Sequence, residues 1–417
     1  MIQKFLSGPP LQRRIRLGAT LLLCLLAAVG IFNFVRTSRG FWMNSVSVDS
    51  LKTESKKHPA DADLNYTLAY RMHQDGRNEE AYQTMLRLTQ QYPDDAKFWL
   101  GLARCAAGAA HSVETVNAYR KALELNPNQA SAYMLLGQLY SEAGLYSDAL
   151  DAFEHGYKAD PNVPVNIRTW IQALDAKGRT QEVWDRTTAA LQQNPKQYEL
   201  YEYIYTAGIA LGKTSDAQNI LYNSLGVLGS YHGSEAKSAL ARLMIVKDQD
   251  ETTLNAAEQL AGEAAKGQGL RAEDFAALAQ VKIAKHELKE ARAILQQGFK
   301  EGPNDLTCLK TLLEVAKREG NKPEAAQLQE RITTQEEGPA EVRERRKAVQ
   351  ASPKNAQAHL ALASVLAKEE QYAPAAEECH EALKIVPNNA AATTLLEEYR
   401  VKALKKLEKA STARHES

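Results

Sequence analysis

The sequence predicts an all-α protein built as a solenoid of stacked helical hairpins. The main observation is a ladder of prolines, each 34 residues after the one before: Pro59, Pro93, Pro127, Pro161 and Pro195. A fixed period of this length is typical of helix-pair repeats, and five unrelated loops would not share it. Between the prolines, large side chains recur at offsets of three, four and seven residues, which places them on one stripe of a helix. We therefore expect paired antiparallel helices along most of the chain.

One repeat carries the pattern most fully. Residues 130–163 hold seven residues at the positions of a known consensus: Tyr133, Leu136, Gly137, Tyr140, Ala149, Phe153 and Pro161. They match W-x2-LG-x2-Y…A-x3-F…P, so the chain resembles the tetratricopeptide-repeat (TPR) family. The resemblance implies a right-handed superhelix whose first helices line an inner groove for partner proteins or extended peptides. It implies little about biochemistry, because TPR arrays serve unrelated pathways.

The N-terminal part predicts a membrane anchor. Residues 1–16 form a basic tail, and residues 17–35 are a run of 19 residues without a charge. At about 1.5 Å per residue this run spans roughly 28 Å, close to the thickness of a bilayer core. A cleavable signal peptide is the alternative, but the apolar run is long for one and continues past the small residues Ala27 and Ala28. We expect one transmembrane helix at 17–35, followed by a juxtamembrane linker at 36–43.

Flanking charges predict the orientation of this anchor. Four basic side chains and the amino terminus precede the apolar run, against Arg36 and Arg39 close behind it. This favours a single-pass protein of a bacterial inner membrane, with its repeats on the periplasmic, extracytoplasmic side. The three cysteines after the anchor, Cys105, Cys308 and Cys379, favour the opposite side, because an odd number of thiols without a CxxC pair does not indicate a disulfide framework.

The rest of the chain divides by how well the repeat register holds. An N-terminal TPR array is expected at 44–231, beginning with a lone helix and continuing with five repeats that start at residues 62, 96, 130, 164 and 198. Gly229 replaces proline on the next step of the ladder, and a degenerate helical hairpin is expected at 232–270. C-terminal TPR repeats follow at 271–389, and a capping helix and tail at 390–417, since such arrays need a polar closing end.

Composition and motifs favour a binding protein over an enzyme. Fifty-one basic residues balance 51 acidic ones, so the net charge does not point to nucleic acid. The nine histidines are scattered, and the sequence has no phosphate-binding loop, nucleophile elbow or metal-ligand spacing. We expect no cofactor, metal or catalytic residue. A hydrolase whose acidic residues meet only in the folded chain remains a further alternative.

The resemblance also implies which side chains face the groove. Positions 2, 5, 9 and 12 of a TPR repeat point into it, and we mapped positions 5 and 9, adding one tyrosine outside the packing positions. The resulting candidate binding residues are Tyr66, Tyr70, Arg104, Met134, Gln138, Arg168, Gln172 and Tyr203. Aromatic, amide and guanidinium groups of this kind can hydrogen-bond an extended peptide and pack against its side chains.

Two TPR subtypes are disfavoured. Tyr66, Tyr70 and Gly101 stand where the clamp for chaperone carboxyl-terminal tails places lysine and asparagine, and the two CxxC pairs of lipopolysaccharide-assembly members are missing. The leading hypothesis is a membrane-anchored scaffold, held through residues 17–35, for assembly or export in the bacterial cell envelope. The alternative is a cytoplasm-facing adaptor that recruits a soluble enzyme to the membrane. The sequence leaves the oligomeric state open.

Overall fold

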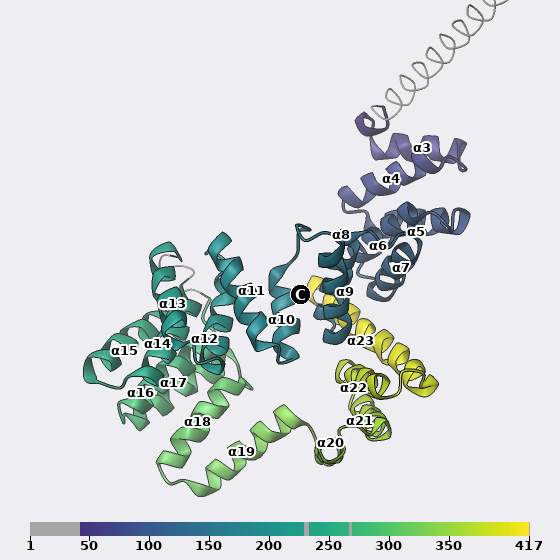
Figure 1. Cartoon of the computed structure of the whole chain (residues 1–417). Coiled ribbons are helices and arrows are strands. Elements are labelled where there is room, and N and C mark those ends of the chain that lie inside the picture. Colours follow the sequence, from purple (N-terminus) through teal and green to yellow (C-terminus); the bar gives the residue numbers. More distant parts are fainter. Residues whose placement is uncertain (1–41, 229–232, 267–268, 417) are drawn as a thin grey trace, which may run out of the picture. The chain divides into compact units, whose positions relative to one another are not determined.

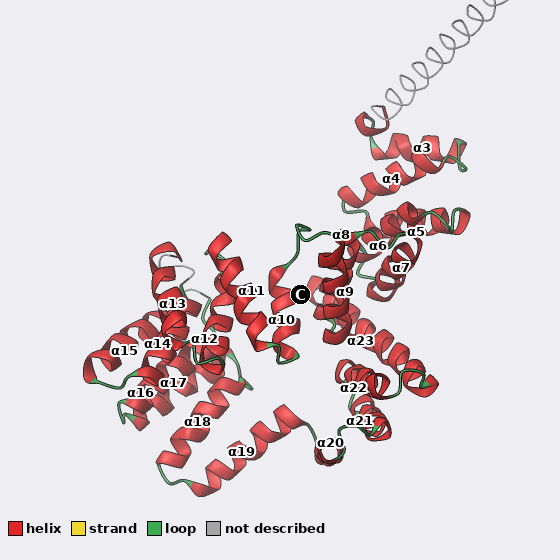
Figure 2. Ribbon diagram, in the orientation of Figure 1, coloured by secondary structure: helices red, strands yellow, loops and turns green. Residues whose placement is uncertain are grey.

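The computed structural model describes residues 42–228, 233–266 and 269–416. Every regular element among these residues is a helix, as Figures 1 and 2 show, so the predicted all-α solenoid of helix pairs is confirmed. The described residues form two compact units: those up to residue 127 make up unit 1, and those from residue 128 onward make up unit 2.

Unit 1 is a lone helix followed by two helix pairs. Its helices are α3 (Val48–Lys57), α4 (Ala62–Gln74), α5 (Asn78–Gln91), α6 (Ala96–Gly108) and α7 (Ser112–Leu125). Helix α3 packs on α4, so it covers the apolar side of the first pair.

Unit 2 continues the same alternation. Its first pairs are α8 (Ala130–Glu142) with α9 (Tyr146–Ala159), α10 (Ile167–Ala176) with α11 (Thr180–Gln193), and α12 (Tyr201–Ala210) with α13 (Thr214–Leu228). A short 3-10 turn, η1 (Tyr198–Leu200), precedes α12. Then come α14 (Ser234–Lys247), α15 (Glu251–Ala264), α16 (Ala272–Ala284), α17 (Leu288–Glu301), α18 (Leu306–Arg318), α19 (Lys322–Glu337), α20 (Ala340–Ala351), α21 (Ala356–Lys368), α22 (Tyr372–Ile385) and α23 (Ala390–Glu416).

The ladder of prolines sets where helices end and begin. A residue before proline disfavours the α conformation, and α3 and α5 accordingly end two residues before Pro59 and Pro93. Two residues after Pro59 and Pro93, an aspartate caps the next helix: Asp61 accepts from the backbone N–H of Leu64 at 3.1 Å, and Asp95 accepts from that of Lys97 at 2.9 Å. The repeated proline thus separates one pair from the next.

Within a pair, the turn requires a left-handed residue at one fixed place. Glycine occupies this place at residues 76, 144, 178, 212 and 320, with φ between 67° and 77°. The equivalent residues of three other pairs are Ala110, His286 and Glu370, with φ of 61°, 62° and 55°. A side chain at positive φ crowds the backbone, so these three residues carry conformational strain that glycine would not.

The core lies between the two helices of a pair and between neighbouring pairs. Phe153, which is fully buried, stacks on Trp170 of the next pair with ring centroids 5.3 Å apart. A Cβ atom at Gly137 would lie 2.7 Å from the Phe153 ring, so only glycine allows α8 and α9 to approach this closely. The consensus residues therefore pack as the repeat pattern predicts.

The described helices do not support the prediction of a single-pass membrane protein. Among the described residues, no helix is long and apolar enough to cross a bilayer. The longest, α23, carries lysine, arginine and glutamate repeatedly from Glu397 to Glu416, which a bilayer core does not accept. The assignment as a single-pass inner-membrane protein is therefore wrong on this finding, and the predicted segment 17–35 itself lies outside the described residues.

Candidate functional site

The first helices of successive pairs lie closer together than the second helices do. In unit 1, α4 contacts α6; in unit 2, α8 contacts α10, and α12, α14, α16 and α18 contact one another in order. A stack that is narrower on one side curves around that side, so the first helices form the inner face of each unit. Helices α10 and α12 pack less closely against each other than the neighbouring first helices of unit 2 do.

Polar side chains lie where α10 approaches η1 and α12, and we call them the groove cluster. Its members come from the start of α9, from α10, from η1 and from α12: Tyr146, Arg168, Gln172, Asp175, Glu199 and Tyr203. Nε of Arg168, on α10, lies 3.1 Å from a carboxylate oxygen of Glu199, in η1. Nε2 of Gln172 donates to the hydroxyl of Tyr146 at 3.4 Å. Three of the predicted residues, Arg168, Gln172 and Tyr203, are thus brought together.

The electrostatics of the groove cluster follow from its position. Partial burial, and after it the charge of Asp175, raises the pKa of Tyr203, while Arg168 acts in the opposite direction. Desolvation also raises the pKa of Asp175. The Asp175 carboxylate makes no side-chain hydrogen bond or ion pair with another residue that the structure describes. A cation supplied by a bound segment would therefore find an uncompensated acceptor here.

The other predicted residues of unit 2 lie on α8 and differ in exposure. Gln138 is half-buried, and its Nε2 donates to Glu142 at 2.8 Å. Met134 is only 4% exposed and packs against Gly156 of α9, so its side chain belongs to the core rather than to the inner surface. The repeat position predicts the direction of a side chain from its helix, but not whether a neighbouring helix covers it.

In unit 1, the predicted residues lie on α4 and α6. The Tyr66 ring is half-buried, with Nζ of Lys97 4.4 Å from its centroid and the Phe98 ring 5.9 Å away. Tyr70 is 42% exposed, and Arg104 is exposed. These two side chains are free to contact a partner, whereas Tyr66 holds α4 against α6.

Sequence reasoning missed two members of the groove cluster that the same rule would have found. Asp175 occupies position 12 of its repeat, and Glu199 occupies position 2 of the next, yet only positions 5 and 9 were mapped. Arg242 of α14 was missed for another reason. It lies outside the regular repeats, binds Glu202 at 2.7 Å, and has its guanidinium carbon 4.0 Å from the centroid of the Tyr205 ring.

A cavity further along the inner face of unit 2 lies among α14, α16 and α18. Its volume is about 360 Å³, and its lining includes Ile245, Val246, Gln280, Lys310, Glu314 and Arg318. Its charges are already compensated, since Lys310 binds Glu336 at 2.6 Å and Arg318 binds Glu314 at 2.7 Å. It offers apolar contact, including Val246 at 58% exposure, rather than charge recognition.

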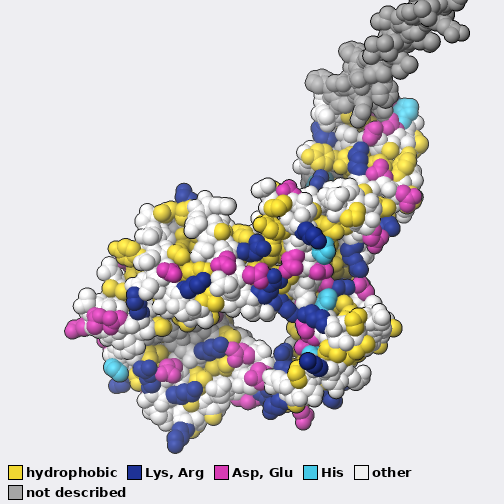
Figure 3. Space-filling model, viewed as in Figure 1, with side chains coloured by type: hydrophobic (Ala, Val, Ile, Leu, Met, Phe, Trp, Pro, Cys, Tyr) yellow, Lys and Arg dark blue, Asp and Glu magenta, His cyan; other side chains and the backbone are white. Residues whose placement is uncertain are grey.

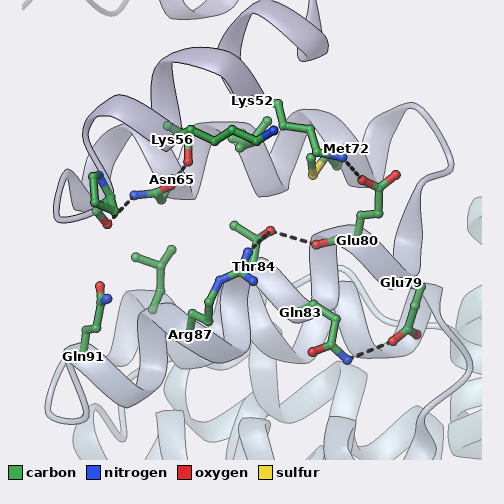
Figure 4. A pocket seen from close by; sticks show the side chains of 14 residues that line it. Lys52, Lys56, Asn65, Met72, Glu79, Glu80, Gln83, Thr84, Arg87 and Gln91 are labelled. Carbon is green, nitrogen blue, oxygen red and sulfur yellow. Dashed lines mark hydrogen bonds and ion pairs between the residues drawn. The ribbon is translucent and has the colours of Figure 1, made fainter.

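Unit 1 has a groove on its outer side, where α3 and α5 spread apart over α4. Figure 4 shows Lys52 and Lys56 of α3 facing Thr84 and Arg87 of α5 across it. The groove has a volume of about 560 Å³ and an apolar floor that includes Met72. Lys52 is paired with Glu80. Hydrogen bonds from Arg77 and Lys52 lower the pKa of Glu80 to about 2.

The described residues hold no group of three histidine, cysteine or acidic side chains placed to bind a metal ion. Cys105, Cys308 and Cys379 are buried, and burial raises the pKa of the Cys105 thiol to about 11 and that of Cys379 to about 12. These thiols are therefore core side chains at neutral pH.

On the face drawn in Figure 3, basic and acidic side chains are interspersed.

Comparison with known families confirms the repeats. A family model described as TPR repeat matches residues 114–144, and one described as Tetratricopeptide repeat matches residues 130–163. The chain therefore contains TPR repeats, and the second match coincides with the helix pair α8 and α9. TPR repeats are typically surfaces that bind other proteins or peptides rather than catalysts.

Individual relatives are distant. Protein SGT1 homolog from Bos taurus is 23% identical over 124 residues, which is 30% of this chain and 36% of that protein. This chain therefore spans little more than a third of that relative's length.

Among solved structures, three similar chains illustrate the range. The APC/C hetero-tetramer Cut9-Hcn1 gives a TM-score of 0.37 at 13% identity, covering 83% of this chain and 85% of that one. A tetratricopeptide repeat protein from Parabacteroides merdae gives 0.37 at 15%, covering 60% and 95%. MamA gives 0.33 at 21%, covering 36% and 89%. Likenesses at these scores support no conclusion about partners.

Proposed function

We propose that the chain is a scaffold that binds an extended segment of a partner protein along the inner face of unit 2, at the groove cluster. The observation that carries this proposal is the groove cluster itself: polar side chains from four elements meet where α10 and α12 pack loosely, and the Asp175 carboxylate among them has no ionic partner in the described residues. An extended peptide needs hydrogen-bond donors and acceptors along its backbone, and amide, phenol and guanidinium groups supply both.

The chemistry of the groove cluster indicates what the partner segment carries. A lysine or arginine side chain of the segment would pair with Asp175, and its charge would lower the pKa of this carboxyl and so offset the effect of desolvation, which now raises it. Tyr203 would pack against the neighbouring part of the segment and donate through its hydroxyl. We therefore expect a basic segment with at least one large apolar side chain.

Gln138 at the α8 end would extend this surface by one repeat. In unit 1, Tyr70 and Arg104 are the corresponding proposed contacts, with Tyr66 behind them as packing support. Met134 is left out because it is buried. The envelope role and the membrane-recruiting alternative both depended on the membrane helix, and they form no part of this proposal.

A site-specific photocrosslinker tests the proposal in cells that make the protein. Replacement of Tyr203 by p-benzoylphenylalanine should yield a discrete crosslinked species on irradiation. The matched control is the same replacement at Tyr222 of α13, which is 69% exposed and lies on the second helix of its pair. If exposure alone decided capture, Tyr222 would crosslink more strongly than Tyr203.

Second-site variants show whether the capture depends on the groove. Asp175→Asn combined with Arg168→Ala should reduce the Tyr203 crosslink at least tenfold, while the helical circular-dichroism signal stays unchanged. Equal capture at both positions, or a Tyr203 crosslink that survives the double variant, would remove the groove cluster as the binding site.

A further inference from the structure

The C-terminal helices of unit 2 contact its first helix pairs. Helix α22 packs against α9, and hydrogen bonds join residues that are 200 to 252 positions apart in the sequence. On the receiving side, the contact is made by the turn edge of two helix pairs, which we define by Gly144, Ser147, Asp148 and Lys177. This contact is separate from the neighbour-to-neighbour packing that builds the solenoid.

A buried ionic network lies at the centre of the contact. Asp148, whose side chain is 7% exposed, accepts from Nε of Arg400 at 2.8 Å and also contacts its terminal nitrogen. Nε2 of His380 lies 3.0 Å from the same carboxylate. Burial by itself raises the pKa of Asp148, but the hydrogen bonds from His380 and Arg400 outweigh it and hold the pKa below its usual value of 3.8. The Asp148 carboxylate is therefore charged at neutral pH in this contact.

A second set of polar bonds lies beside the first. The carboxylate of Glu377 accepts from the backbone N–H of Ser147 at 2.8 Å, from the Ser147 hydroxyl at 2.5 Å, and from Nζ of Lys177 at 2.9 Å. Burial lowers the pKa of Lys177, but the bonds to Glu377 and Glu381 outweigh it and raise the pKa. The turn at Gly144 lies close to Ala373 of α22: a Cβ atom added at Gly144 would lie 3.2 Å from the Cβ of Ala373.

The composition of this contact differs from that of the solenoid core. Neighbouring pairs are joined by buried apolar side chains such as Phe153 and Trp170, whereas the turn edge meets the C-terminal helices mainly through charges and hydrogen bonds. An interface within a chain that is small and polar resembles a transient complex, because its groups can be solvated again when it opens. Separation of an apolar interface would instead expose surface that water does not stabilise.

We propose that the turn edge is a docking surface whose ligand is the last two helices of the chain's own described part, α22 and α23, and that this docking is reversible. The two helices act as a latch: Arg400 and His380 bind Asp148, and Glu377 bridges Ser147 and Lys177. The helix expected to be a polar end cap of the array is in this state an intramolecular partner of repeats more than 200 residues earlier.

The latch adjoins the groove cluster. Tyr146 of the groove cluster directly precedes Ser147, and Asp175 stands two residues before Lys177. Docking of the C-terminal helices therefore orders the same two backbone segments that carry groove residues. The latch itself rests on the contacts above and not on the proposed binding of a partner.

Zero-length carbodiimide crosslinking of the purified protein tests the latch directly. The amine of Lys177 and the carboxylate of Glu377 are 2.9 Å apart, so they should become joined within one chain and appear as linked peptides in mass spectrometry of the monomer band. An internal standard is the neighbouring pair Lys282 and Glu258, 2.7 Å apart and on adjacent helices. No Lys177–Glu377 link, or a link found only in a dimer band, would overturn the proposal.

Variants and salt test what holds the latch and whether it opens. Arg400→Gln and Asp148→Asn should each reduce the Lys177–Glu377 link at least fivefold relative to the standard, and Asp148→Arg with Arg400→Asp should restore it. Arg292→Gln, which removes an ion pair between adjacent pairs, is the matched control and should leave the link unchanged. At ~1 M sodium chloride the Debye length is about 3 Å, so the charges of an opened latch no longer attract one another and reclosing is weakened; the link in the unmodified protein should therefore decrease.

Each outcome is decisive if the variants keep the helical circular-dichroism signal and the Lys282–Glu258 link. Retention of the Lys177–Glu377 link in both single variants would show that the ionic network does not hold the contact. A link that does not respond to salt would show a permanent part of the fold instead of a latch. Should a single variant lose helicity, the charge-exchanged double variant carries the test.

Discussion

Nδ1 of His359, in α21, lies 2.7 Å from a carboxylate oxygen of Glu378, in α22, and Nε2 of the same ring lies 3.1 Å from the carbonyl oxygen of Pro353. Both partners are acceptors, so both ring nitrogens must donate, and only the charged imidazolium can do so. Burial lowers the pKa of His359, but these two hydrogen bonds outweigh it and hold the pKa above its usual value of 6.5.

The first prediction is a pH dependence of stability in this C-terminal repeat. A raised pKa in the folded state means that the stabilisation is complete below pH 6.5 and is lost as the pH rises through the folded-state pKa. The urea midpoint of the protein should therefore fall as the pH is raised above about 6.5. His359→Gln should flatten this dependence, whereas His155→Gln, at an exposed histidine of α9, should preserve it. An unchanged pH profile in His359→Gln would contradict the prediction.

The second prediction concerns the left-handed turn residue. Ala110 has φ of 61° at the place where five other pairs have glycine, so Ala110→Gly should relieve strain and stabilise the protein by about 0.5–1 kcal/mol. The preceding residue is the matched control: Ala109 has φ of −87°, and Ala109→Gly should not stabilise. Chemical denaturation of the two variants under one set of conditions compares them. Equal effects of both substitutions would count against the strain argument.

The same reasoning extends to His286 and Glu370, which occupy the equivalent place in distant pairs. Because these sites share no partners, the gains of His286→Gly and Glu370→Gly should add to that of Ala110→Gly.

The third prediction concerns a fully buried carboxylate. Asp274, with 0% exposure, accepts from the Ser238 hydroxyl of α14 at 2.7 Å and from the guanidinium of Arg271 at 2.9 Å, and also from the backbone N–H of Arg271 at the start of α16. Asp274→Ala would leave these donors unpaired and should destabilise the protein by about 3–5 kcal/mol.

A matched acidic control is available on α4. Asp63 pairs with Lys97 at 3.3 Å but is 73% exposed, so Asp63→Ala should change the denaturation midpoint little. Comparable losses in the two variants would show that burial does not set the value of the Asp274 network.

The repeat period carried most of the fold information. Pro59, Pro93 and Asp61 act within a few residues of themselves, ending one helix and starting the next, so the helix pairs follow from local sequence. The same is true of Gly137 and Phe153, whose contact lies inside one pair. The membrane assignment rested on the apolar run at 17–35 alone. It is wrong on the finding that none of the described helices is long and apolar enough to span a bilayer.

The candidate site was predictable only in part. The repeat positions found Arg168, Gln172 and Tyr203, and a complete mapping would have added Asp175 and Glu199. They did not show that Met134 is covered, because burial depends on how tightly the neighbouring helix packs.

By itself, the sequence determined an all-helical chain of paired helices with TPR repeats and no recognisable catalytic motif. Only the tertiary structure decided that α10 and α12 pack loosely against each other, and that Arg400 meets Asp148 across 252 residues. The physical reason is that a repeat encodes contacts with its immediate neighbours, whereas meetings between distant repeats depend on small rotations summed over many pairs.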